Sequence, residues 1–295
     1  MIKTEIAAAR FADLESWSGS ELIEGIIEGQ FAAIAAVHAV RPLLSEAVEK
    51  ATQRLEAGGR LIYLGAGTSG RIATQDAAEL PPTFNWPYAR AISLMAGGNG
   101  AFIEAVEGAE DSETAAPQAL DHHGVGPNDV VIGLAASGRT PFTIAGLAHA
   151  RKKGALTIGI HNNPGGQVGA VSEIDILLDT GAEILAGSTR MKAGTAQKAA
   201  LNCISTGVMI ALGYVYKGLM VEMRPTNEKL RIRAAEIVAA ITGAKPEVAQ
   251  TVLVQTDYSI KLAAIMIVQG LDLAAAESVL AQAGGNLRIA MDGRA

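Results

Sequence analysis

Five short apolar runs, each followed by a polar or glycine-rich segment, constrain the fold of this 295-residue chain more than any other feature. Each run is rich in leucine and β-branched residues and does not alternate apolar with polar positions, which is typical of strands buried on both faces of a parallel sheet. Helix-like segments fill the gaps, so the pattern predicts a doubly wound α/β fold with right-handed crossovers. Ligands bind such sheets outside the carboxyl ends of the strands, so functional residues are expected just after each run. The runs are Leu61–Leu64, Ala91–Met95, Val130–Leu134, Leu156–Ile160 and Ile174–Leu178.

Helical segments flank the predicted sheet on both sides. Apolar residues recur at helical spacing before Gly58-Gly59, which is a helix-end signal. After Pro225 the strand-like runs stop, and one long helix followed by a compact appendage of three short helices is expected. The pattern therefore predicts three parts: an N-terminal helical segment (1–58), a sheet domain (59–225) and a C-terminal helical domain (226–295).

Composition and charge exclude several classes of function. The formal net charge of −6 argues against a nucleic-acid partner, because phosphate backbones attract basic surfaces. A single cysteine, Cys203, cannot form an internal disulfide, and the first residues lack an apolar segment of signal-peptide length, so a cytoplasmic protein is expected. One stretch, 201–221, is about long enough to cross a bilayer. Asn202 and Lys217 interrupt it, so we interpret it as a buried helix, identify no second candidate, and expect no membrane association.

The turn after the first run carries a candidate phosphate site. Residues 65–71 read GAGTSGR, which formally matches the G-x-G-x-x-G pattern of dinucleotide sites. Such sites also need an acidic residue at the end of the second strand, and the chain there reads Met95-Ala96-Gly97-Gly98. Thr68 and Ser69 instead offer hydroxyl donors beside a helix N-terminus, which suits a single phosphate group. A purely structural turn is the alternative.

Two further polar turns follow later runs. Ser137, Gly138 and Thr140 lie at the start of a helix, where unpaired backbone N–H groups and the helix dipole favour an anion, although one of the hydroxyls could simply cap that helix. A third cluster contains Glu183 and then 187–198, GSTRMKAGTAQK. Its cations either balance a ligand's negative charge or only mark the start of a helix.

These motifs resemble those of the sugar isomerase (SIS) domain, which binds phosphosugars on a parallel sheet, and within that superfamily they are most similar to the N-acetylmuramic acid 6-phosphate etherases. The likeness runs from about residue 59 through the C-terminal helices, which resemble that family's ubiquitin-associated-like lid. The motifs that carry it are GAGTSGR (65–71), DAAELPPTFN (76–85), AVEGAEDS (105–112), GLAASGRTPF (133–142) and GSTRMKAGTAQKAALNCISTG (187–207).

The resemblance implies a reaction that needs two acidic side chains. The family removes D-lactate from the C3 ether of N-acetylmuramic acid 6-phosphate by elimination, and water addition then gives N-acetylglucosamine 6-phosphate. One group must abstract the C2 proton and another must protonate the ether oxygen. By resemblance these catalytic residues are Glu110 as base and Glu79 as acid. Glu79 is expected near the C-terminus of a helix stopped by Pro81-Pro82, where the dipole favours a protonated carboxyl group.

The resemblance also implies the rest of the site. It places the phosphate on Ser69, Ser137 and Thr140, with Thr68, Gly138 and Ser188 as further contacts, and it implies a homodimer that needs no cofactor. The acids Glu107, Asp111 and Glu113 compete with Glu110 by proximity alone. No metal site is expected, because the adjacent pair His122-His123 lies in a loop that suits a solvated surface.

The N-terminal segment departs from the family pattern, and two other functions stay open. Thr4-Glu5 matches an early Thr-Glu of the family, but an expected Arg-Asn-Pro stretch is replaced by residues 6–10, IAAAR, and 27–30, IEGQ, stands where an Asn-x-Glu-Asp-like stretch is usual. The alternatives are a regulatory protein that senses a sugar phosphate without turnover and a phosphosugar isomerase. The presence of both Glu79 and Glu110 favours an enzyme over a sensing protein, and lactate release separates the isomerase from an etherase.

Overall fold

A computed structural model describes residues 2–293 of the chain. The chain forms two compact units. The first contains the residues up to Ala78 together with Tyr88–Thr206, and the second contains Glu79–Pro87 and the chain from Gly207 onward. The division at 58/59 and 225/226 stays a prediction.

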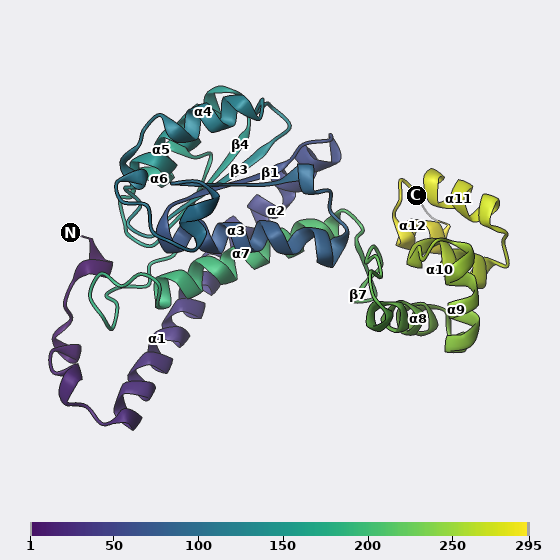
Figure 1. Cartoon of the computed structure of the whole chain (residues 1–295), viewed down its shortest axis with the longest axis horizontal. Helices are drawn as coiled ribbons and strands as arrows, with labels where there is room; N and C mark the ends of the chain where they lie inside the picture. The colour runs from purple at the N-terminus through teal and green to yellow at the C-terminus, as the bar shows by residue number, and fades with distance from the viewer. Residues whose placement is uncertain (1, 294–295) are drawn as a thin grey trace. The chain divides into compact units, whose positions relative to one another are not determined.

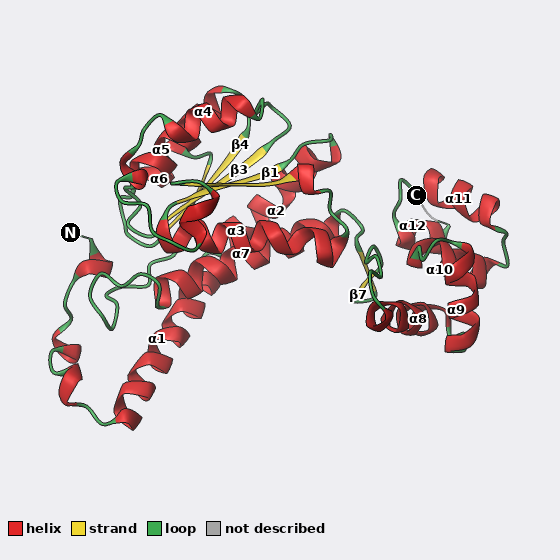
Figure 2. Cartoon of the chain, in the orientation of Figure 1, coloured by secondary structure: helices red, strands yellow, loops and turns green. Residues whose placement is uncertain are grey.

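The first unit is built on a five-stranded sheet in which every strand is parallel to its neighbours, in the order β2-β1-β3-β4-β5. Figure 2 shows these strands in yellow between two layers of red helices. The predicted doubly wound parallel sheet is confirmed, and all five predicted runs are strands. The strands are β1 (Leu61–Gly65), β2 (Ala91–Met95), β3 (Val130–Ala135), β4 (Leu156–His161) and β5 (Ile174–Leu177).

Helices cover both faces of this sheet (Figure 1). One face carries α4, α5 and α6, which pack on one another and, through α5 and α6, on the central strands. The other face carries α2, α3 and α7, and α1 adjoins α7, with Gln30 Oε1 accepting a hydrogen bond from Thr195. The helices that lie wholly or mostly in this unit are α1 (Gly19–Ala39), α2 (Arg41–Glu56), α3 (Gly67–Phe84), α4 (Ala115–His122), α5 (Pro141–Lys152), α6 (Gln167–Val171) and α7 (Lys192–Ala211), with short 3-10 helices η1 (Lys3–Glu5), η2 (Ala9–Phe11), η3 (Leu14–Ser16), η4 (Tyr88–Arg90), η5 (Asn99–Phe102) and η6 (Ala109–Asp111).

Burial along the strands follows their position in the sheet. Every residue of β1, β3 and β4 is buried, as expected for strands covered by helices on both faces. The edge strands β2 and β5 are only partly buried, so the prediction of burial on both faces is wrong for them. They lie at the ends of the sheet, where one side of each strand has no neighbouring strand.

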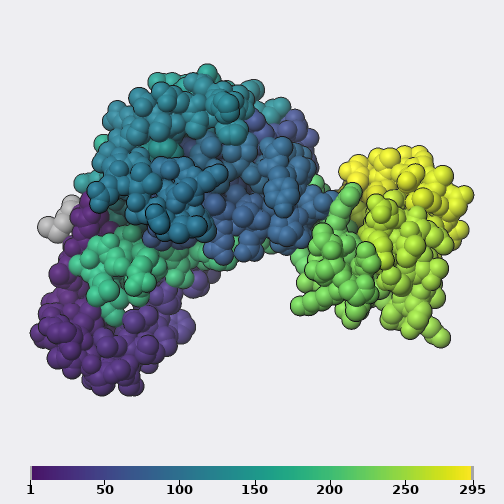
Figure 3. All heavy atoms as spheres, in the orientation of Figure 1, coloured from purple at the N-terminus to yellow at the C-terminus, as the bar shows by residue number. Residues whose placement is uncertain are grey.

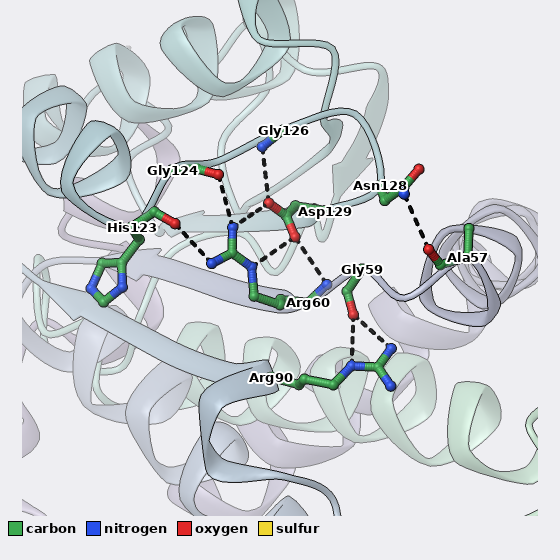
Figure 4. Close-up of polar contacts among 9 residues, drawn as sticks. All are labelled: Ala57, Gly59, Arg60, Arg90, His123, Gly124, Gly126, Asn128 and Asp129. Atoms are coloured by element: carbon green, nitrogen blue, oxygen red, sulfur yellow. Dashed lines mark hydrogen bonds and ion pairs between the residues drawn. The ribbon is translucent and has the colours of Figure 1, made fainter.

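A polar cluster closes the edge of the sheet at which the strands begin (Figure 4). The Asp129 carboxylate accepts hydrogen bonds from the backbone N–H, Nε and Nη2 of Arg60, at 3.0, 2.9 and 2.6 Å, and from the backbone N–H of Gly126 at 2.9 Å. The Arg90 guanidinium donates to the carbonyl oxygens of Gly59 and Leu55. These contacts join the starts of β1, β2 and β3.

The second unit consists of a hairpin and a helical bundle. The sequence predicted one long helix and three short ones, and the structure adds a fourth short helix, α12, together with the hairpin. Its buried core includes Val238, Leu253, Ile265 and Leu287. The elements are β6 (Val215–Tyr216), β7 (Leu219–Met220), α8 (Glu228–Thr242), α9 (Pro246–Gln255), α10 (Ile260–Gln269), α11 (Leu273–Gln282) and α12 (Leu287–Asp292).

The expectation for the apolar stretch 201–221 is only half right. Its first half ends α7, which stops at Ala211, and its second half forms the β6–β7 hairpin, so it is not one buried helix. The expectation of a single candidate span is also wrong. Within 2–293, α1 is long and apolar enough to cross a membrane by length and composition, and two bent pairs, α8 with α9 and α10 with α11, meet the same test if each pair counts as one span.

Candidate functional site

A cavity of about 400 Å³ lies in the first unit, where the polar turns that follow β1 and β3 meet the segment before α7. Its volume is within the range of small-molecule sites. It is lined by Ile2, Thr4, Glu5, Ala66, Gly67, Thr68, Ser69, Glu110, Asp111, Ala135, Ala136, Ser137, Arg139, Thr140, Pro141, Gly187 and Thr189. The cavity thus brings together four hydroxyl-bearing residues, Thr68, Ser69, Ser137 and Thr140, with Glu110.

The first glycine turn brings the start of α3 close to the end of β1. A Cβ on Gly65 would lie 2.8 Å from the Cα of Gly70, so only glycine allows this approach of helix to strand. Ser69 follows in the first turn of α3. It is 6% exposed, and its hydroxyl donates a hydrogen bond to Gln197 Oε1 at 2.9 Å. The side chain therefore lies in the cavity wall and is oriented by a helix on the same face of the sheet.

The second turn places the N-terminus of α5 at the cavity. Gly138 has φ +71°, and a Cβ there would lie 2.7 Å from the Cα of Gly166, so the turn requires glycine. Ser137 Oγ accepts a hydrogen bond from the backbone N–H of Arg139 at 3.1 Å. Thr140 is the N-cap residue of α5 but makes no side-chain capping hydrogen bond. Thr140 lines the cavity beside the positive end of a twelve-residue helix, where an anion would be stabilised.

The third polar cluster contributes backbone and one hydroxyl rather than cations. Gly187 and Thr189 line the cavity, whereas Ser188, Arg190 and Lys192 are absent from its lining. Gly138 also lies in the supporting turn and outside the lining.

Glu183 caps the helix that follows this cluster. Its carboxylate accepts hydrogen bonds from the backbone N–H groups of Ala193, at 2.9 Å, and Lys192, at 3.2 Å. Burial raises the pKa of Glu183, and these two N–H donors oppose that shift. The residue therefore fixes the start of α7 and does not itself face the cavity.

Glu110 reaches the cavity from the short helix η6, which packs against α5. The side chain is exposed, so solvent and substrate can reach its carboxyl group. Of its sequence neighbours, Asp111 also lines the cavity, while Glu107 and Glu113 do not. The packing of η6 on the helix that begins at the second turn links the position of this acid to the turn that contains Ser137 and Thr140.

Glu79 lies in the second half of α3 and does not line the cavity of its own chain. The prediction that Pro81-Pro82 stops this helix is wrong, because α3 continues through both prolines to Phe84. Proline removes hydrogen bonds that the helix would otherwise make, but buried Leu80 and Phe84 hold the last turn in place. Ten residues separate Ser69 from Glu79, which corresponds to about 15 Å of helix rise.

Sequence reasoning missed the part of the cavity made by the N-terminus. Ile2, Thr4 and Glu5 line it, although they precede the first strand by more than fifty residues. The available signal was the Thr4-Glu5 pair itself, which matches the early Thr-Glu of the family pattern. Arg139, the cation in the second turn, was also missed.

The parallel sheet and the hydroxyl-bearing turns at the carboxyl ends of its strands define a phosphosugar-binding protein of the SIS class. The family model for the SIS domain matches residues 112–206, and that for the glucokinase regulatory protein N-terminal SIS domain matches residues 43–151. The solved phosphoheptose isomerase from Francisella tularensis is 20% identical, with a TM-score of 0.50 over 65% of this chain and 98% of that chain. A putative phosphosugar isomerase from Bacteroides fragilis gives the same identity and TM-score over 67% and 94%. These two likenesses show the fold.

Curated relatives are much more similar and match nearly the whole length. The N-acetylmuramic acid 6-phosphate etherase of Deinococcus radiodurans is 46% identical over 286 residues, covering 97% of this chain and 94% of the relative. The protein of the same name from Salmonella agona is 46% identical over 280 residues, covering 95% and 94%. The chain belongs to the N-acetylmuramic acid 6-phosphate etherase family.

Proposed function

We propose that this protein is a carbon–oxygen lyase that converts N-acetylmuramic acid 6-phosphate and water to N-acetylglucosamine 6-phosphate and D-lactate. Membership of the etherase family supports the reaction. The observation that carries the proposal is the meeting of Glu110 with the hydroxyls of two anion-binding turns in one cavity. Amino-sugar metabolism of this kind, including cell-wall recycling, belongs in the cytoplasm, where phosphorylated sugars are made and used.

The anion-binding turns hold the phosphoryl group. Thr68, Ser137 and Thr140 offer hydroxyls, and Ser69 joins them by turning its hydroxyl from Gln197 to the phosphate. The first turns of α3 and α5 offer backbone N–H groups and the positive ends of two helix dipoles. Gly138 belongs to the second turn, and Ser188 lies in the segment before α7; neither lines the cavity itself. A phosphate fixed at one end of an open-chain hexose positions C2 and C3 for the acid and the base.

Glu110 is assigned the C2 proton. Its carboxylate removes that proton, the C2–H electron pair moves into a double bond between C2 and C3, and the C3–O bond breaks. Glu79 gives its proton to the departing ether oxygen, which therefore leaves as the hydroxyl group of D-lactate. Water then adds across the double bond, its oxygen to C3, with Glu79 taking the released proton and Glu110 returning one to C2. Both acids end the cycle as they began it.

The place of Glu79 favours a homodimer. Because α3 carries this residue about 15 Å of helix rise away from Ser69, it is absent from the cavity lining of its own chain. A second copy that sets its own α3 beside the cavity would supply the missing acid. We therefore propose a dimer in which each site combines Glu110 of one copy with Glu79 of the other.

Lactate release tests the reaction. Purified protein incubated with N-acetylmuramic acid 6-phosphate is expected to release D-lactate, and Glu110→Gln and Glu79→Gln are each expected to lower kcat by about 10²–10⁴-fold while remaining folded. Glu113→Gln, an exposed acid outside the cavity, is the matched control and should keep full activity. No lactate from the wild-type chain would reject the etherase and leave the sensing protein or the isomerase.

Mixing the two inactive variants tests the shared site. If subunits exchange, a mixed dimer has one site with both acids intact, so an equimolar mixture should recover about a quarter of wild-type activity. Failure to recover any activity after demonstrated exchange would place both acids in one chain's site.

A further inference from the structure

The N-terminal segment is held against the sheet domain by buried hydrogen bonds. Chain termini are usually poorly ordered unless they are tied down, yet Thr4 is only 1% exposed. Its backbone N–H donates to Asn163 Oδ1 at 3.2 Å, its Oγ1 accepts from Asn163 Nδ2 at 3.0 Å, and its carbonyl oxygen accepts from the N–H of Gly187 at 2.8 Å. Figure 3 shows the purple N-terminal residues beside the green segment that precedes α7.

The residues that hold Thr4 also build the walls of the site. Asn163 Nδ2 donates a second hydrogen bond, at 2.8 Å, to the carbonyl oxygen of Ala136 in the turn before Ser137. Gly187 lines the cavity itself. One buried amide therefore joins the N-terminal segment to the anion-binding turn, so the position of residues 3–5 is coupled to the position of that turn.

Glu5 comes directly after this anchored residue and lines the cavity with its side chain exposed. A phosphorylated amino sugar has two kinds of group to satisfy: a phosphate that needs donors, and hydroxyl and acetamido N–H groups that need acceptors. The turn hydroxyls and helix N–H groups meet the first need. Glu110 is engaged at C2, which leaves Glu5 and Asp111 as the carboxylates of the lining for the second.

We infer that Glu5 is a substrate-binding residue, which accepts a hydrogen bond from a hydroxyl or the acetamido N–H of the sugar, and that Thr4 is the positioning residue that holds it there. The inference rests on the proposed function for the identity of the sugar. A carboxylate accepts hydrogen bonds from neutral donors strongly and repels phosphate. Glu5 therefore favours an anion that carries a sugar over a bare anion of the same charge.

Titration calorimetry tests this directly, because it compares the affinity for a sugar phosphate with the affinity for inorganic phosphate. Glu5→Gln is expected to weaken binding of N-acetylglucosamine 6-phosphate by about tenfold, because a charge-assisted hydrogen bond is lost. Binding of inorganic phosphate, which needs only the turns, should be unchanged or tighter. Glu56→Gln, an exposed acid at the end of α2, should change neither. Equal weakening of both ligands, or of neither, would overturn the inference.

Thr4→Val tests the positioning role, because valine keeps the shape of threonine while removing the oxygen that Asn163 Nδ2 binds. We expect about threefold to tenfold weaker binding of the sugar phosphate, with inorganic phosphate unaffected. Wild-type affinity for the sugar phosphate would remove Thr4 from the inference.

Kinetics separates binding from chemistry at Glu5. The Glu5→Gln variant should raise KM for N-acetylmuramic acid 6-phosphate by about tenfold with kcat within about twofold of wild type. A fall in kcat at unchanged KM would make Glu5 an acid–base group and overturn its assignment to binding. The calorimetric arms do not depend on turnover, so they remain decisive even if the wild-type chain releases no lactate.

Discussion

The central sheet has one edge where its strands begin and an opposite edge where they end, and the polar groups at these two edges differ in whether they are paired within the protein. At the edge where the strands begin, Arg60 donates to the carbonyl oxygens of His123 and Gly124, just after α4 (Figure 4). Arg90 donates to the carbonyl oxygens of Leu55 and Gly59 at the end of α2. At the edge where they end, hydroxyls and the first turns of α3 and α5 surround an open cavity. One edge has its polar groups paired internally, and the other offers them to a ligand.

The polarity of the helices explains this difference. In a parallel α/β sheet every helix ends near the start of the next strand and begins near the end of the preceding one. Unpaired carbonyl groups and negative dipole ends therefore gather at the first edge, and unpaired N–H groups and positive dipole ends gather at the second. Arginines at the first edge stabilise the fold, while the second edge is suited to bind a phosphorylated sugar.

The largest predicted difference between the two edges is in the free energy of unfolding. Asp129→Asn leaves the Arg60 guanidinium, which is mostly buried, without its carboxylate. We expect a loss of about 2–3 kcal/mol in the free energy of unfolding, below the value for a fully buried pair because Arg60 retains some solvent contact. KM for the substrate should not change, since β3 separates Asp129 from the cavity by about 20 Å. Urea unfolding followed by circular dichroism and a lactate assay measure the two quantities.

The control for that variant is Asp121→Asn. Asp121 pairs with His149 and Lys153 at 2.9 and 2.8 Å. These pairs lie on the surface, where the high dielectric constant of water makes ion pairs weak. Its replacement should change stability far less than Asp129→Asn does. Equal losses from the two variants would contradict the view that the edge cluster stabilises the fold through burial.

The next prediction concerns the edge where the strands end, at which a substitution should weaken substrate binding and leave the free energy of unfolding unchanged. Thr140→Val removes a hydroxyl that lines the cavity and makes no capping hydrogen bond, so α5 should keep its stability. We expect KM to rise by about fivefold to tenfold, as for the loss of one hydrogen bond to a charged group. Thr143→Val, which lies one turn further along α5 and donates to the carbonyl oxygen of Leu134, is a control for a general effect on the helix. A drop in unfolding free energy with unchanged KM would make Thr140 a cap.

The sheet and the turns that line the cavity could be predicted because their signals are local. Each buried strand is a short apolar run, and each turn needs glycine where backbone atoms meet, as at Gly65 and Gly138. Glu110 is carried by a local motif in the same way and lines the cavity from η6, while its catalytic role stays a prediction.

What could not be predicted depends on distant contacts. The bond between Thr4 and Asn163 joins residues 159 positions apart, so no window of sequence reveals that the N-terminus lines the site. Continuation of α3 through Pro81-Pro82 depends on the burial of Leu80 and Phe84, which outweighs the local preference of proline to end a helix. The sequence places Glu183 in the third polar cluster without showing its role, because its capping partners, Lys192 and Ala193, contribute backbone N–H groups that leave no sequence signal.

The smallest predicted effect comes from two buried carboxyl groups, Asp129 at the first edge and Glu183 at the second, whose pKa values shift in opposite directions. Burial would raise the pKa of Asp129, but Arg60 and the N–H of Gly126 together hold it below its usual value of 3.8. Burial raises the pKa of Glu183 above its usual 4.5, and its backbone N–H partners only partly oppose the shift. The pairing with a guanidinium accounts for the opposite directions.

Opposite shifts give opposite dependences of stability on pH. A lowered pKa means that the stability contributed by Asp129 is fully present above pH 3.8 and is lost as the pH falls through the lower folded value. A raised pKa means that the contribution of Glu183 is largest below pH 4.5 and declines as the pH rises through the higher folded value.

Unfolding free energies of wild type, Asp129→Asn and Glu183→Gln, measured in urea at intervals from acid to neutral pH, compare the two pH dependences. The advantage of wild type over Asp129→Asn should shrink below pH 3.8, whereas its free energy relative to Glu183→Gln should fall as the pH rises above 4.5. The same sign for both variants would show that burial alone, and not the partner at each edge, sets these two ionisations.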